Sequence, residues 1–144
     1  MTLVINPAMQ IIGYTIGNDV SSRDIEGKNP LYLPQAKIYR HSCAIGPVIT
    51  IKDNSLDISN LTIKLIINRN NKKLFEGKTT TSKINRSITE LIEYLGCYND
   101  FPNGVILMTG TGIVPDDNFT LCDKDEVIIE IESIGTLSNP VKQM

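Results

Sequence analysis

Hydrophobic residues along this chain recur mostly with the two-residue period of β-strands. The clearest alternation runs from Leu61 to Asn68, where every second residue is Leu or Ile. Asn70 and Asn71 then mark a turn, so the next segment can return as the second arm of a hairpin. The segments with strand character are 2–5, 10–16, 48–52, 61–68, 72–78, 104–109 and 126–132. The pattern predicts a protein built mostly of short β-strands.

One segment has instead the three-to-four-residue period of an amphipathic helix. Its apolar positions are Ile84, Ile88, Leu91, Ile92 and Leu95. Ser87 and Glu90 have the spacing of a capping box, in which the hydroxyl accepts an amide hydrogen bond and the glutamate reaches back. Because Gly96 is a natural stop, we expect one main helix that ends there.

Residues 21–42 show no sustained period and contain Gly27, Pro30 and Pro34. We therefore expect a long irregular loop between strands, and loops of this length inside a compact domain are often functional. The chain has no repeats, linkers or low-complexity tracts. Residues 1–144 are thus expected to form a single domain of the α+β class, mostly β with one main helix.

The composition argues against several classes of function. The 144 residues are 41% hydrophobic and 21% charged, and 14 Lys and Arg against 16 Asp and Glu argue against a dedicated nucleic-acid partner. No apolar run reaches the roughly 18 residues needed to span a membrane. The three cysteines are widely spaced and form no CxxC pair, which argues against disulfides and a zinc knuckle. No basic region precedes an apolar stretch at Met1, so the start is not typical of a secretory signal. Together these features lead us to expect a cytoplasmic protein without nucleic-acid or membrane partners.

Asp19 is the first candidate for chemistry, because it follows an apolar strand at the start of a polar turn. A carboxylate at a strand end is well placed to offer a hard oxygen ligand to Mg²⁺, Mn²⁺ or Ca²⁺. The alternative is an Asx turn, in which the same carboxylate accepts backbone amides. We expect the nearby Arg23 and Asp24 to belong to the scaffold of the loop.

Lys37 is the second candidate, since it lies in an otherwise uncharged and partly apolar stretch. If burial removed it from water, it could act as a base or bind an anion. The alternative is a surface lysine whose ammonium group reaches solvent, as most lysines do.

Thr111 is the third candidate, within the sequence Met108-Thr-Gly-Thr-Gly112. The glycines permit close approach of the backbone, so Thr111 could offer a hydroxyl and an amide to a carboxylate. The segment is neither a dinucleotide fingerprint nor a P-loop, because no helix and no Gly-Lys-Ser/Thr element follows. A tight turn is the alternative.

Taken together, several stretches resemble the fumarylacetoacetate hydrolase family. They are Gly13–Asp24, Lys37 followed by Cys43–Pro47, the helix at Leu91–Leu95, Gly104–Gly112 and Val127–Asn139. The match extends over essentially the whole chain in the family's order, and the Asn-Asp-Val-Ser-x-Arg-Asp element is highly specific. The resemblance implies the family's fold, a mixed β-roll or incomplete barrel, and places this chain in its C-terminal catalytic portion.

The resemblance also implies a site. In that family a divalent ion, usually Mg²⁺, is held by a Glu-x-Glu pair and an aspartate, and it chelates a small 2-oxo acid. The motif assigns the metal aspartate to Asp19, the lysine beside the metal and substrate to Lys37, and a substrate-contacting threonine to Thr111. The family's Glu-x-Glu pair precedes the strand that is here 2–5, so we expect this chain to be incomplete as an enzyme.

Segment 25–37 is most similar to the branch that contains 2-keto-3-deoxy-D-arabinonate dehydratase. In such chemistry a base removes the C3 proton of a chelated 2-oxo acid, and loss of the C4 hydroxyl completes the dehydration. Lys37 is expected to act as that base or as the acid that assists departure.

Two other hypotheses stay open. An acylpyruvate-type C–C bond hydrolase has the same fold and metal, and an inactive remnant would only fold and oligomerise. Without upstream strands we expect 2–5 to lie at an open sheet edge, which another copy of the chain would cover to give a homo-oligomer.

Overall fold

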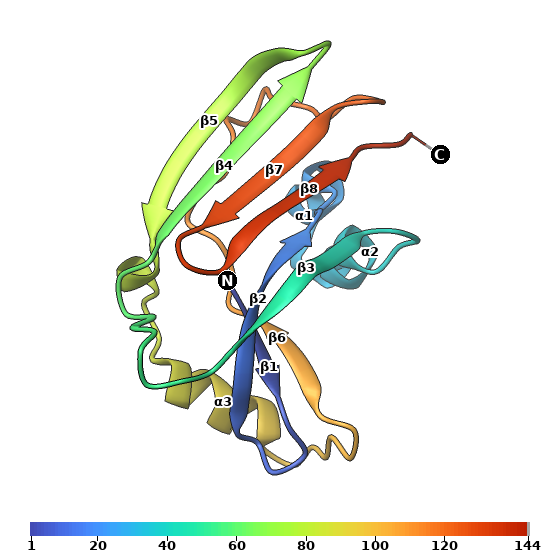
Figure 1. The fold of residues 1–144 in the computed structure, drawn as a ribbon. Coiled ribbons are helices and arrows are strands. Elements are labelled where there is room, and N and C mark those ends of the chain that lie inside the picture. Colours follow the sequence, from blue (N-terminus) through green and yellow to red (C-terminus); the bar gives the residue numbers. More distant parts are fainter. Residues whose placement is uncertain (144) are drawn as a thin grey trace.

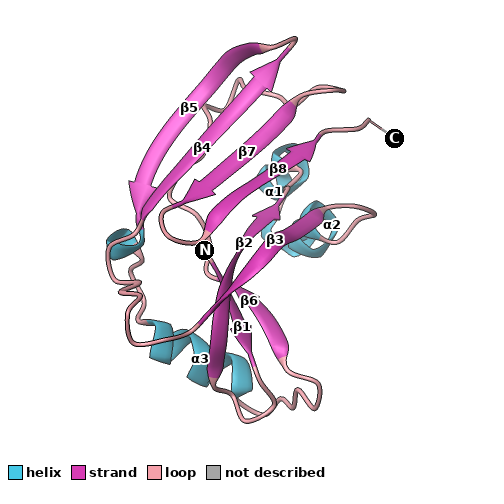
Figure 2. Cartoon of the chain, viewed as in Figure 1, coloured by secondary structure: helices cyan, strands magenta, loops and turns pink. Residues whose placement is uncertain are grey.

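The computed structural model describes residues 1–143 as two four-stranded antiparallel sheets with short helices beside them (Figure 1). Figure 2 shows how strongly strands dominate. The strands are β1 (Thr2–Ile5), β2 (Ile11–Asp19), β3 (Cys43–Ile51), β4 (Thr62–Arg69), β5 (Lys72–Thr80), β6 (Val105–Met108), β7 (Glu126–Ile131) and β8 (Gly135–Pro140). The helices are α1 (Arg23–Lys28), α2 (Leu33–Lys37) and α3 (Ile88–Gly96), with 3₁₀ turns η1 (Pro30–Tyr32) and η2 (Thr81–Lys83). The expected α+β class, mostly β and without a closed barrel in the described residues, is confirmed.

The first sheet has the strand order β3-β2-β1-β6. Its strand β1 is interior, because Leu3 pairs with Tyr14 of β2 on one side and with Leu107 of β6 on the other. The expectation that residues 2–5 form an open edge is therefore wrong. The partner on that side comes from a segment about a hundred residues later, and the local pattern of the sequence does not reveal such a pairing. The edges of this sheet are β3 and β6.

The second sheet has the order β5-β4-β7-β8. The alternation expected in 61–68 is confirmed, since Leu61 and Ile67 are buried while Lys64 points to the outer face and pairs with Glu76 at 3.1 Å. Hydrophobic residues of both sheets form a shared core, which α3 helps to cover. The fully buried members of this core include Leu3, Ile5, Ile16 and Ile131.

Helix α3 confirms the helical period and half of the expected cap. The Ser87 hydroxyl accepts a hydrogen bond from the Glu90 amide at 3.1 Å. The Glu90 carboxylate does not return to Ser87 but accepts from Arg86 at 2.8 Å. Ile84 precedes the helix, which ends at Gly96 as expected. Within residues 1–143, none of the helices is long and apolar enough to cross a membrane.

The expectation of an irregular loop over residues 21–42 is wrong in part. The segment folds into α1, η1 and α2, each six residues or fewer. Such short elements show no helical period, so the pattern gave no signal for them. What holds the segment together is tertiary: Ala36 is fully buried, and the Ser22 amide donates to the Ala36 carbonyl at 2.9 Å.

Two strands also differ from expectation. β3 begins at Cys43 rather than at residue 48, and β8 follows β7 where no separate strand was expected. β8 contains few large apolar residues and is defined by its ladder with β7, in which Ile129 pairs with Leu137. Both differences add strand residues beside the end of β2, where Cys43 of β3 pairs with Asp19 and Asn139 of β8 contacts Asn18.

Candidate functional site

Strand β2 carries Asp19 to the end of the first sheet, where it faces Cys43 in the ladder with β3. The preceding residue, Asn18, donates from its side-chain amide to the Asn139 side chain of β8 at 3.3 Å. This hydrogen bond joins the two sheets directly beside Asp19. The site therefore lies where both sheets and the segment 20–42 come together, and Figure 1 shows α1 and α2 beside the end of β2.

Lys37 closes α2 and reaches back to the strand end. Its ammonium nitrogen lies 3.0 Å from Oδ2 of Asp19 and also donates to the hydroxyl of Ser21. The Lys37 side chain is one-third exposed and that of Asp19 is 42% exposed, so the pair is open to solvent. The structure thus brings Asp19 and Lys37 together, although eighteen residues separate them.

Hydrogen bonds from neighbouring groups hold the end of β2 in place, and the Asp19 carboxylate shifts the pKa values of two side chains nearby. The Tyr39 hydroxyl donates to the Val20 carbonyl at 2.6 Å, and the Val20 amide donates to the Ser42 carbonyl at 2.8 Å. Burial raises the pKa of Tyr39, and the Asp19 carboxylate raises it further. The same two causes raise the pKa of Cys43, which favours the thiol and makes Cys43 a poor nucleophile.

Thr111 lies beyond the same end of the first sheet. β2 and β6 both pair antiparallel with β1, so both strands leave the sheet at that end, after Asp19 and Met108. The Thr111 hydroxyl donates to the Ile113 carbonyl at 3.3 Å and lies 3.1 Å from the Ile113 amide, from which it accepts. The Thr111 hydroxyl is thus engaged locally, and no hydrogen bond joins Thr111 to Asp19 or Lys37.

Asp19 suits a divalent cation as one ligand among several. Its Oδ1 has no hydrogen-bond partner in the described part of the chain, while Oδ2 is taken by Lys37. However, residues 1–143 contain no group of three or more His, Cys, Asp or Glu side chains that could hold a metal ion. Since Mg²⁺ and Ca²⁺ affinity comes from several fixed oxygens, one carboxylate beside an ammonium group is not a complete site.

The two clearest hollows on the surface of the described residues lie elsewhere. One is beside α3, between Met9 and Ile92. The other is on the outer face of the second sheet, over Lys64 and Glu130. Asp19, Lys37 and Thr111 line neither of them.

A family model described as "Fumarylacetoacetate (FAA) hydrolase C-terminal" matches residues 5–142. The chain belongs to the fumarylacetoacetate hydrolase family. The 2-dehydro-3-deoxy-D-arabinonate dehydratase of Saccharolobus solfataricus is 48% identical over 143 residues, covering 99% of this chain and 48% of that protein. The probable 2-keto-3-deoxyxylonate dehydratase of Haloferax volcanii is 46% identical, covering 92% and 46%. This chain spans about half the length of the curated relatives it matches.

Among solved structures, a 2-keto-3-deoxy-D-arabinonate dehydratase complexed with magnesium and 2,5-dioxopentanoate superimposes on this chain with a TM-score of 0.96. The two sequences are 48% identical over 99% of this chain and 51% of that one. The resemblance drawn from the sequence motifs is therefore confirmed, including the similarity to the dehydratase branch of the family.

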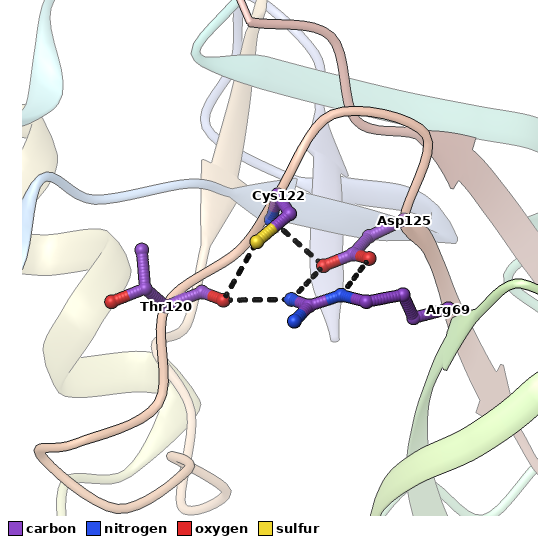
Figure 3. A network of polar contacts seen from close by, with 4 residues as sticks. All are labelled: Arg69, Thr120, Cys122 and Asp125. Carbon is purple, nitrogen blue, oxygen red and sulfur yellow. Dashed lines mark hydrogen bonds and ion pairs between the residues drawn. The ribbon is translucent and has the colours of Figure 1, made fainter.

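Figure 3 shows a second polar cluster, which no motif in the sequence indicated. Arg69 of β4 donates from Nε and Nη2 to the two carboxylate oxygens of Asp125 at 2.7 and 2.8 Å, and from Nη2 to the Thr120 carbonyl at 2.9 Å. Asp125 is fully buried and also accepts from the Cys122 amide at 2.8 Å. The guanidinium group holds the pKa of Asp125 below its usual range, and the Cys122 amide contributes. This cluster anchors the connection that carries Thr111.

Proposed function

We propose that this chain provides the Asp19–Lys37 part of a divalent-metal-dependent dehydratase that acts on 2-keto-3-deoxy sugar acids. The observation that carries the proposal is the contact of Lys37 with Asp19 at 3.0 Å, in a chain 48% identical to a dehydratase over nearly its whole length. Asp19 would be one ligand of Mg²⁺. Residues outside these 144 would supply the other carboxylates, since the matched relatives are about twice as long.

The reaction places a definite demand on Lys37. A bound Mg²⁺ would chelate the carboxylate and keto oxygens of the substrate and so acidify its C3 protons. As the ammonium group that now donates to Asp19, Lys37 can give a proton to the departing C4 hydroxyl, which leaves as water. As a neutral amine it would instead take the C3 proton. In both roles its nitrogen must lie beside C3 or C4, and the hydrogen bonds to Asp19 and Ser21 hold it next to the metal ligand.

Thr111 would bind the substrate carboxylate in this proposal. Its hydroxyl is engaged in its own turn, so the turn must open or the backbone amide must act instead. The similarity of Thr111 to the family's threonine supports this assignment, and no contact within the described residues bears on it.

The proposal is tested in a chimera in which the preceding half of the Saccharolobus dehydratase is joined to Met1. With Mg²⁺ and 2-keto-3-deoxy-D-arabinonate, we expect release of the dioxo acid. Lys37→Met should reduce kcat/KM by roughly 10²–10⁴-fold, the range for loss of an acid–base group. Asp19→Asn should also reduce kcat/KM, because it removes a charged ligand of the metal ion. Arg86→Gln, which removes an exposed ion pair beside α3, is the matched control. Full activity in the Asp19 and Lys37 variants would overturn the proposal.

A catalytically inactive domain is the second candidate, because the described residues lack a complete set of metal ligands. Calorimetry of the chimera with Mg²⁺ or Mn²⁺ separates the two candidates. Micromolar binding that Asp19→Ala abolishes would count against the inactive domain. A chimera that folds and still turns over no sugar acid would favour it.

A further inference from the structure

The connection between β6 and β7, residues 109–125, carries Thr111 and contains no helix or strand among its described residues. Its two ends are held. At the start, the amide and the hydroxyl of Thr109 donate to the Met1 carbonyl at 3.2 and 2.9 Å. At the other end, Arg69 donates to the Thr120 carbonyl and binds Asp125. The middle of the connection has a third attachment, which comes from a segment far away in the sequence.

That attachment is Arg23, the first residue of α1. Its Nη1 donates to the Pro115 carbonyl at 2.8 Å and to the Asp116 carbonyl at 3.3 Å, and its Nη2 donates to the Asp117 carboxylate. More than ninety residues separate donor and acceptors. A planar guanidinium group can satisfy three acceptors at once because its donors diverge in a fixed fork. Arg23 therefore binds a stretch of backbone, and the exposed carboxylate is only one of its partners.

Arg23 and Lys37 belong to one rigid piece of the chain. The Ser22 amide donates to the Ala36 carbonyl at 2.9 Å, directly beside both residues. α1 also packs against α2, and Ala36 of α2 is fully buried. The position of the Arg23 backbone is thus tied to that of Lys37, which in turn contacts Asp19.

We propose that Arg23 is a positioning residue that holds the Thr111 connection against the segment carrying Lys37. Four residues separate Thr111 from Pro115, so the chain keeps their Cα atoms within about 14 Å of each other. Fixing the Pro115 carbonyl therefore limits where Thr111 can lie. The functional part of this inference rests on the proposed function, in which Lys37 and Thr111 act on one substrate.

The attachment depends on the carbonyl contacts more than on the ion pair. Asp117 is 97% exposed, and solvent-exposed ion pairs contribute little. The contact with the Pro115 carbonyl is partly buried. Asp117→Asn should therefore change the attachment little. Arg23→Gln removes the guanidinium group, and with it the donors to both carbonyls. Arg23→Lys keeps the charge but presents its donors from a single nitrogen and not from a planar fork, so it should restore the attachment only in part.

Hydrogen exchange of the 144-residue chain tests this directly. The reporters are the Ile113 amide, bound to the Thr111 hydroxyl, and the Phe119 amide, bound to the Asp116 carbonyl at 2.9 Å. In Arg23→Gln both should exchange roughly tenfold faster or more, since hydrogen bonds from a charged group are stronger than those between neutral groups. Arg23→Lys should lie between Arg23→Gln and the parent, and Asp117→Asn should match the parent.

Two controls distinguish positioning from a general loss of stability. The Cys122 amide, held by Asp125, should keep its exchange rate in Arg23→Gln, as should the amides of β4. Unchanged exchange at Ile113 and Phe119, or an equal rise throughout the chain, would overturn the inference. Binding of 2,5-dioxopentanoate with Mg²⁺, measured on the same substitutions in the chimera described above, is a separate readout. Failure of the unsubstituted chimera to bind would count against the proposed function and would leave the exchange result on Arg23 unaffected.

Discussion

The ammonium group of Lys37 donates to Oδ2 of Asp19 at 3.0 Å, across the eighteen residues that separate the end of β2 from the end of α2. Two short helices fold the intervening segment back so that the cation meets the carboxylate. The arrangement places a proton donor beside a candidate metal ligand. Because both side chains are partly exposed, the pair contributes little to stability.

Asp19→Asn should therefore separate function from folding. An exposed pair contributes about 0–1 kcal/mol, so the urea midpoint should move little. In the chimera, affinity for Mg²⁺ should fall, because an amide oxygen carries no charge and is a weaker ligand. Urea denaturation and calorimetry on the same preparation measure both. A large loss of stability with unchanged cation affinity would assign Asp19 to the scaffold.

Asp125→Asn should destabilise the fold by about 2 kcal/mol, because it leaves Arg69 without a charged partner and weakens a buried network. The magnitude is moderate because the Arg69 side chain is one-third exposed. The measurement is the urea unfolding free energy at neutral pH. A variant as stable as the parent would show that the attraction between Arg69 and Asp125 only offsets the free-energy cost of removing the two groups from water.

The same carboxylate predicts a pH dependence. The pKa of Asp125 is lower in the folded chain than in the unfolded chain. Its contribution to the free energy of unfolding is therefore fully present above the unfolded pKa of about 3.9. It is lost as the pH falls through the folded value. Unfolding free energies measured from pH 7 down into this acid range should fall more steeply for the parent than for Asp125→Asn. If the unfolding free energy fell equally steeply in both proteins, Asp125 would not be the group responsible for the pH dependence.

Two glycines offer a matched pair of substitutions. A Cβ at Gly104 would lie 2.4 Å from the Ile5 carbonyl oxygen, at a φ of +78° that favours glycine. Gly104→Ala should therefore destabilise the chain by about 2 kcal/mol or more. A Cβ at Gly27 in α1 would meet nothing within 4 Å, so Gly27→Ala should stabilise by about 0.5–1 kcal/mol. Thermal unfolding of both variants checks the opposite signs.

The outer face of the first sheet predicts self-association. Ile45 and Ile51 of the edge strand β3 are 45% and 68% exposed, and Ile106 of β6 is 46% exposed. We expect a homo-oligomer in light scattering at tens of micromolar, which Ile51→Lys should weaken. The control is Tyr94→Lys on α3, where the replaced side chain is equally exposed but lies on another element. A monomeric parent would contradict this prediction.

The local sequence pattern predicts those elements whose stability is local or regularly amphipathic. The alternation in β4 and the period and Ser87 cap of α3 are examples. It fails where tertiary contacts decide. β8 exists because it pairs with β7, and α1 and α2 are too short to show a period.

The candidate site divides in the same way. The motif around Asp19 is contiguous and specific, so the resemblance identified it and the structure then brought Lys37 to it. Arg69 and Asp125 lie 56 residues apart and belong to no short motif, so nothing in the sequence connects them. The contacts of Arg23 with the backbone of 115–116 are also hidden from the sequence, because carbonyl acceptors have no side-chain signature.

The most direct test of the account is the rate of 2-keto-3-deoxy-D-arabinonate dehydration by the 144-residue chain alone, with Mg²⁺ in excess. Asp19 is the one candidate carboxylate ligand that the described residues bring to the site, so we predict no turnover above the uncatalysed rate. The chimera with the preceding half of the Saccharolobus dehydratase should be active under the same conditions. Turnover by the chain alone would contradict the claim that carboxylates from outside these residues complete the site.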